Sequence, residues 1–192
     1  MDNCSFLEYF KAFTPFIIAF IVYIVWHFQK SNEVLANESK NLIVQINETM
    51  LLASEAMDLL RNAYINYEKI PDGLSSLNSK LSDFKIKIHT TTGTLSFLSE
   101  AIGDKELEDL SYEYWNKMNT IYNGFDLEMN KVENRVRFQE KDDEYIIMQY
   151  NNVADISNKI KRSYMGYAMY RNSWLLKQTG RVNVKIIKRK EK

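Results

Sequence analysis

The side chains that could carry out chemistry are few in this sequence and lie far apart. His27 and His89 are the only histidines, and Cys4 is the only cysteine. A metal site or a nucleophile paired with a histidine needs several such groups at close spacing, so the sequence predicts neither kind of site. The single cysteine also excludes an intrachain disulfide.

Two further patterns could suggest a binding site, and each has a structural explanation. Asp142, Asp143 and Glu144 are consecutive carboxylates, but consecutive positions on a helix point apart, so the start of a helix explains them better than a bound divalent cation. No glycine begins a phosphate-binding loop of the known patterns. We therefore predict no catalytic residue, metal site, cofactor or small-molecule substrate, and we expect a protein that is not an enzyme.

The composition predicts an all-α protein. The chain has 192 residues, of which 45% are hydrophobic and 26% are charged, and only two prolines and six glycines interrupt it. So few breaks favour long helices over sandwiches and barrels. The formal net charge is zero, which predicts no attraction of the whole molecule to nucleic acid.

The N-terminal residues 1–30 are expected to form a tail and a single transmembrane anchor. The apolar run from Phe6 to Phe28 contains only Glu8 and Lys11 as charged residues, and it is just long enough to cross a bilayer. Thr14-Pro15 predicts the start of the spanning helix. A cleaved signal peptide and a buried core helix are the alternatives. The residues expected to face lipid are Phe16, Ile17, Ile18, Phe20, Ile21, Val22, Ile24, Val25 and Trp26.

The basic residues that flank this segment give a prediction of its orientation. Lys11 stands on one side of the apolar run, and Lys30 and Lys40 stand on the other. The positive-inside rule then favours a single-pass protein of the inner membrane with most of the chain in the cytoplasm.

Residues 31–180 show apolar stripes at helical spacing, which predict four helices at about 31–70, 74–102, 104–138 and 143–179. Pro71-Asp72-Gly73 and Gly103-Asp104 predict the first two breaks. The first stripe is Ile43, Ile46, Met50, Ala53, Met57, Leu60, Tyr64 and Tyr67. The second stripe is Leu77, Leu81, Phe84, Ile88, Thr91, Leu95 and Leu98.

The last break is ambiguous, because the third and fourth stripes share one phase across residues 138–144. A turn there predicts an antiparallel four-helix bundle, and an unbroken helix predicts a long coiled-coil dimer. The apolar faces are wider than a two-stranded seam, which favours the bundle.

Two groups of residues near the C-terminus could contact a partner. Tyr164, Tyr167, Tyr170 and Trp174 are candidate partner-binding aromatics, with the bundle core as the alternative. Residues 181–192 form a basic tail, whose Lys188, Arg189 and Lys190 could contact lipid headgroups or an acidic partner. A solvated terminus is the alternative for the tail.

The segment from Thr14-Pro15-Phe16-Ile17-Ile18-Ala19 through Trp26 to Gln29-Lys30 resembles the start of uncharacterised single-pass membrane proteins of bacteria and their prophages. The resemblance covers residues 12–30 and implies a helical cytoplasmic region, with no catalytic residues to transfer. Many of those proteins continue with a basic Lys-Leu-Arg stretch, where this chain has Ser31-Asn32-Glu33-Val34-Leu35.

Together these patterns predict a membrane-anchored helical interaction or scaffold module, bacterial or phage-encoded and non-catalytic. Its expected partners are the membrane and either a protein partner or further copies of the chain. Confinement to a membrane raises effective concentration, so a weak contact suffices. The alternative is a periplasmic sensor or receptor whose helical bundle binds a small ligand.

Overall fold

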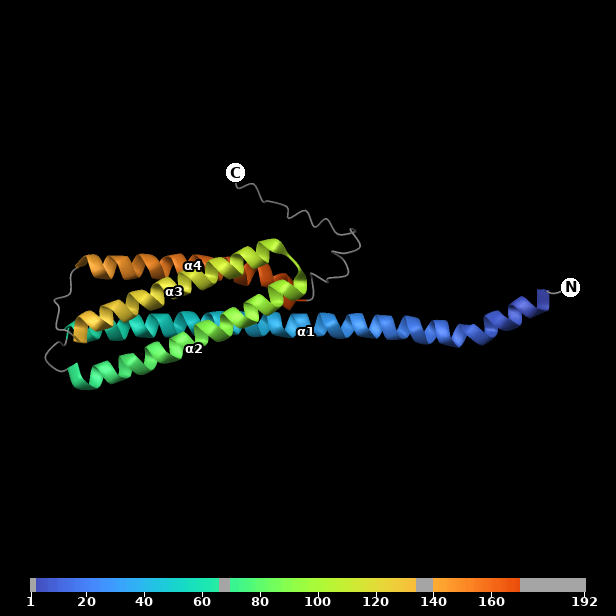
Figure 1. Ribbon diagram of the computed structural model, residues 1–192, viewed down its shortest axis with the longest axis horizontal. Helices are drawn as coiled ribbons and strands as arrows, with labels where there is room; N and C mark the ends of the chain where they lie inside the picture. Colours follow the sequence, from blue (N-terminus) through green and yellow to red (C-terminus); the bar gives the residue numbers. More distant parts are fainter. Residues whose placement is uncertain (1–2, 66–69, 134–139, 170–192) are drawn as a thin grey trace, which may run out of the picture.

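The computed structural model describes residues 3–65, 70–133 and 140–169, and nearly all of them are helical. The helices are α1 (Asn3–Ile65), α2 (Ile70–Ile102), α3 (Lys105–Glu133) and α4 (Glu140–Ala168). Figure 1 shows the four helices side by side, with the N-terminal part of α1 projecting far beyond the others. The fold is therefore a helical bundle with one long projecting helix.

The structure decides between the two interpretations of the break between the third and fourth predicted helices. α3 and α4 are separate helices that pack against each other, and α1 packs against both α2 and α4. The alternative of one unbroken helix from α3 into α4 is wrong, because the wide apolar faces are covered by helices of the same chain. The connection over residues 134–139 lies outside the described residues.

The core confirms the predicted face of α2 completely and that of α1 in part. Leu77, Leu81, Phe84, Ile88, Thr91, Leu95 and Leu98 are all buried. In α1, however, Ile43, Met50 and Met57 are only half-buried. The buried residues of α1 are Ala36, Ser39, Leu42, Gln45, Ile46, Thr49, Ala53, Ala56 and Leu60. The buried face of α1 is wider than the predicted stripe and displaced from it, because the helix packs between two neighbours.

The corner between α2 and α3 is built by two adjacent residues. Gly103 adopts a left-handed backbone with φ of 66°, and its N–H donates to the carbonyls of Ser99 and Glu100. Asp104 then begins α3, since its Oδ1 accepts a hydrogen bond of 3.1 Å from the N–H of Glu106. The break lies where the sequence predicts it.

The positions of Pro15 and Pro71 in the structure show that two predicted helix boundaries are wrong. α2 begins at Ile70, so Pro71 lies in its first turn, where a missing N–H costs no hydrogen bond. α1 begins at Asn3 and runs through Pro15, so the predicted start at Thr14-Pro15 is wrong. The Thr14 hydroxyl donates to the Phe10 carbonyl at 2.6 Å. Figure 1 shows α1 bending toward its N-terminal end, as expected for a proline inside a helix.

Two ion pairs join α1 and α2 on the surface. Glu48 pairs with Lys87, and Glu55 pairs with Lys80 at 2.6 Å. The residue numbers rise along α1 while they fall along α2, so these two helices run in opposite directions. The hydrogen bond and the charge of Glu55 raise the pKa of Lys80. Partly exposed pairs of this kind contribute little stability and mainly favour this register.

Candidate membrane segment and the α2–α3 cleft

The projecting part of α1 presents its large apolar side chains to the outside. Phe16 is 72% exposed, Phe20 63% and Trp26 58%. The other predicted lipid-facing residues are similarly exposed, apart from the half-buried Ile24: Ile17, Ile18, Ile21, Val22 and Val25. Apolar surface of this extent is unfavourable in water, so it indicates a membrane or a partner. The buried core-helix alternative for this segment is therefore wrong.

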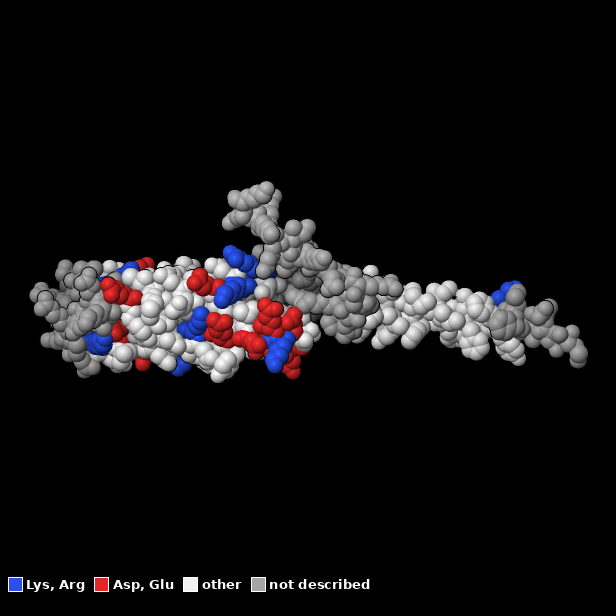
Figure 2. Space-filling view, turned by 90° about the horizontal axis from the view of Figure 1, so that it is seen from above, with Lys and Arg blue, Asp and Glu red and all other residues white. Residues whose placement is uncertain are grey.

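The segment has the length and composition of a membrane span. Lys11 is the only charged residue between Tyr9 and Gln29, and Lys30 follows directly. At 1.5 Å per residue, the rise from Lys11 to Lys30 is about 28 Å, close to the thickness of a hydrocarbon core. α1 is a candidate membrane span by these criteria, and none of its most apolar window is buried in the bundle. Figure 2 shows charged side chains gathered over the bundle and near the far end of the projecting helix, whereas the stretch of that helix drawn in white between them carries none on this face.

The aromatic residues predicted to contact a partner do not form such a surface in the described structure. Tyr164 is fully buried and Tyr167 is 3% exposed, with their ring centroids 6.1 Å apart. Both belong to the core, which was the alternative interpretation of their position on the stripe. Tyr170 and Trp174 lie outside the described residues, as do the tail residues Lys188, Arg189 and Lys190.

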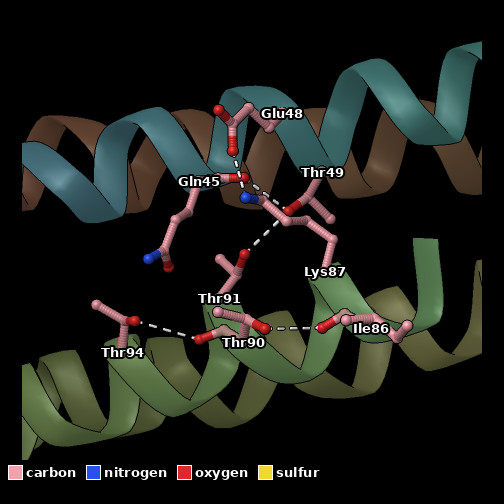
Figure 3. A network of polar contacts seen from close by, with 8 residues as sticks. All are labelled: Gln45, Glu48, Thr49, Ile86, Lys87, Thr90, Thr91 and Thr94. Atoms are coloured by element: carbon pink, nitrogen blue, oxygen red, sulfur yellow. Dashed lines mark hydrogen bonds and ion pairs between the residues drawn. The ribbon is translucent and has the colours of Figure 1, made fainter. Parts of the chain in front are cut away.

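The centre of the bundle contains a polar contact between α1 and α2. The hydroxyl oxygens of Thr49 and Thr91 are 2.9 Å apart, and both residues are fully buried. The Thr49 hydroxyl also lies 2.7 Å from the carbonyl of Gln45, to which it donates. Figure 3 shows the two threonine hydroxyls pointing toward each other, while Thr90 and Thr94 bond only to their own helix.

Two buried tyrosines extend this polar interior. Burial raises the pKa of Tyr114, and the neighbouring Thr49 partly opposes that shift. Burial also raises the pKa of Tyr164, with smaller contributions from Tyr167 and Asp104. Neither hydroxyl makes a hydrogen bond of good geometry within the described part of the chain. These groups give the core a polar character.

A cleft of about 630 Å³ opens between α2 and α3 close to their shared corner. α2 lines it mainly with small polar residues, and α3 contributes aromatic rings and a carboxylate. His89 of α2 packs on Trp115 of α3 with ring centroids 5.2 Å apart. The lining residues are His89, Thr92, Gly93, Ser96, Ser99, Glu100, Glu108, Ser111, Tyr112 and Trp115.

Sequence reasoning placed His89 correctly beside the apolar stripe but missed this cleft. The residues of α2 and α3 that line it are distant in sequence, and they meet only because the corner at Gly103 folds α3 back on α2. The one feature of the sequence that could have indicated the cleft was Gly93, since glycine is unfavourable inside a helix. Within the described ranges, no three His, Cys, Asp or Glu side chains are placed to hold a metal ion.

Comparison with known proteins finds no matching family model, no matching curated protein and no matching solved structure.

Proposed function

We propose that this chain is a membrane-anchored, antiparallel four-helix bundle that serves as a non-catalytic interaction or scaffold module. The observation that carries the proposal is the exposed apolar part of α1, which continues as the same helix into the core of the bundle. Because α1 is one continuous helix, no linker separates the anchor from the bundle.

The mechanism that we propose is tethering. A bundle held at a membrane meets its partner at a raised effective concentration, so a weak contact is sufficient for binding. The partner is a second protein or another copy of this chain. The resemblance of residues 12–30 supports a bacterial or prophage source, and Lys30 and Lys40 support an inner-membrane protein with its bundle in the cytoplasm.

Membrane attachment is tested by expressing the full chain beside a variant that lacks residues 1–30. The full chain should stay in the membrane fraction after an alkaline carbonate wash and should be released by detergent. The shortened chain should remain in the soluble fraction. Recovery of the uncut full chain from the cytosol without detergent would contradict the proposal.

Orientation is tested separately by C-terminal fusions. A cytoplasmic bundle predicts a fluorescent green fluorescent protein fusion and an inactive alkaline phosphatase fusion. The opposite pattern would place the bundle in the periplasm and would support the receptor alternative instead.

A further inference from the structure

The cleft between α2 and α3 has an electrostatic character that selects for cations. Glu100 and Glu108 contribute two carboxylates to its lining, and neither has an ion-pair partner among the described residues. The described lining contains no lysine or arginine. An anion would meet two like charges there, whereas a cation would be attracted.

The walls of the cleft provide aromatic surface for the same kind of ligand. Trp115 and Tyr112 come from α3, and His89 packs on Trp115 from the α2 side. The faces of tryptophan and tyrosine rings attract ammonium groups, and they also cover the apolar carbon atoms that such groups carry. Together with the carboxylates, they suit an organic cation better than a bare metal ion.

The lining also contains four serine and threonine side chains, those of Thr92, Ser96, Ser99 and Ser111. The buried Thr92 Oγ1 has no hydrogen-bond partner in the described structure. The hydroxyls of Ser99 and Ser111 donate to the carbonyls of Ser96 and Leu107, so their oxygens remain able to accept. Of these four residues Ser96 is the exposed one, so its hydroxyl is open to a ligand that carries N–H donors.

Gly93 leaves the space that such a ligand needs. A Cβ atom built on Gly93 would meet no other atom within 4 Å. The cleft volume of about 630 Å³ falls within the usual range of small-molecule sites. A short alkyl chain with an ammonium group at each end fits this volume.

We propose that the α2–α3 cleft binds an alkylamine that carries one or two ammonium groups. The aromatic rings contact its carbon chain, and the carboxylates of Glu100 and Glu108 pair with its ammonium groups. This site is distinct from the membrane segment and does not depend on the orientation of the bundle.

The first test measures binding of 1,4-diaminobutane to the full chain in mild detergent by isothermal titration calorimetry. The control ligand is 1,4-butanediol, which has the same carbon chain but no charge. The diamine should bind with a stoichiometry of one per chain, and the diol should give no signal at the same concentrations. Equal binding of the two compounds, or binding of neither at millimolar concentration, would overturn the proposal.

The second test compares variants of exposed acidic residues. Glu100→Gln combined with Glu108→Gln should weaken diamine binding roughly tenfold or more, because the charge-assisted hydrogen bonds are lost. Glu106→Gln combined with Asp109→Asn removes the same charge from the same corner but from residues outside the described lining. Binding that falls equally in both double variants would show only a general charge effect and would contradict the site.

The third test fills the cleft. Gly93→Leu should abolish binding, since its side chain occupies the free space, whereas Gly93→Ala should retain most of the affinity. Both replacements favour the helix, so the thermal midpoint of each variant should not fall. A Gly93→Leu protein that melts like the parent and still binds the diamine would disprove this location.

Discussion

Thr91 donates its hydroxyl proton to Thr49 across the α1–α2 interface. The two oxygen atoms are 2.9 Å apart, and the proton of Thr49 is already directed to the carbonyl of Gln45 at 2.7 Å. A hydroxyl has one proton, so the direction of the shared bond follows. The chain of hydrogen bonds therefore runs from Thr91 to Thr49 to the backbone of α1.

This direction predicts unequal effects of two similar substitutions. Thr49→Val leaves the buried Thr91 hydroxyl without its acceptor and should cost about 1–3 kcal/mol of unfolding free energy. Thr91→Val leaves the bond from Thr49 to Gln45 intact and should cost about 1 kcal/mol. The double variant removes both hydroxyls and should cost less than the sum. Urea unfolding in detergent, followed by circular dichroism, measures all three. Equal single effects that add fully would contradict the assigned direction.

The buried Tyr114 predicts how stability changes with alkaline pH. Its pKa is raised by burial, so the folded state holds the proton more tightly than the unfolded state. The associated stability is fully present below the unfolded pKa of about 10 and is lost as the pH rises further.

Tyr114→Phe should therefore reduce the alkaline loss of stability by up to about 1.4 kcal/mol per pH unit. At pH 8 the same change should be close to neutral, because the removed hydroxyl makes no hydrogen bond of good geometry with the described residues. The urea midpoint measured between pH 8 and 11 checks both expectations. Tyr112→Phe is the control, since Tyr112 is 70% exposed.

The two glycines of α2 and its corner predict opposite effects of the same replacement. Gly103→Ala should destabilise the bundle by about 1–2 kcal/mol, because a Cβ atom is strained at a φ of 66°. Gly93→Ala should stabilise it by up to about 1 kcal/mol, because Gly93 lies inside a regular helix with open space around it. Thermal unfolding of the two variants against the parent gives the comparison. A gain in stability for Gly103→Ala would contradict the left-handed corner.

Much of the fold follows from local signals in the sequence. The α2 face was predictable because its apolar residues follow helical spacing strictly, and the corner because glycine and aspartate have strong positional preferences. Thr14-Pro15 was misleading, since a threonine-proline pair also occurs inside a long apolar helix. There Thr14 bonds backward to Phe10 and does not cap a new helix.

The candidate sites were less predictable, because they depend on contacts between distant residues. The sequence pattern around Tyr164 and Tyr167 is the same for a partner-binding surface and for a core. These tyrosines are buried by the packing of α4 against its neighbours, which the sequence does not show directly. The α2–α3 cleft is lined by Gly93 from one helix and by Trp115 from the other, a relationship that no single helix reveals. The candidate membrane span was predictable, because the uncharged and mainly apolar stretch from Ala12 to Phe28 is a signal in itself.

Charged substitutions in the projecting helix should separate membrane attachment from folding. Ile18 is 55% exposed and Ile21 is 53% exposed, so neither depends on the bundle for its packing. Ile18→Asp combined with Ile21→Asp should cost about 6 kcal/mol of membrane insertion, since each aspartate near the centre of a span costs about 3 kcal/mol. The double variant should move from the membrane to the soluble fraction or aggregate before insertion, while the conservative Ile18→Leu with Ile21→Leu stays in the membrane.

The thermal midpoint of the bundle provides the accompanying measurement. Both double variants, purified in the same detergent, should melt within a few degrees of the parent, because surface changes that touch no core residue alter stability by less than about 0.5 kcal/mol. A di-aspartate chain that remains in carbonate-washed membranes would show that lipid does not cover this face. A large fall in its midpoint would show instead that the face packs against protein, and the tethering mechanism would then lose its physical basis.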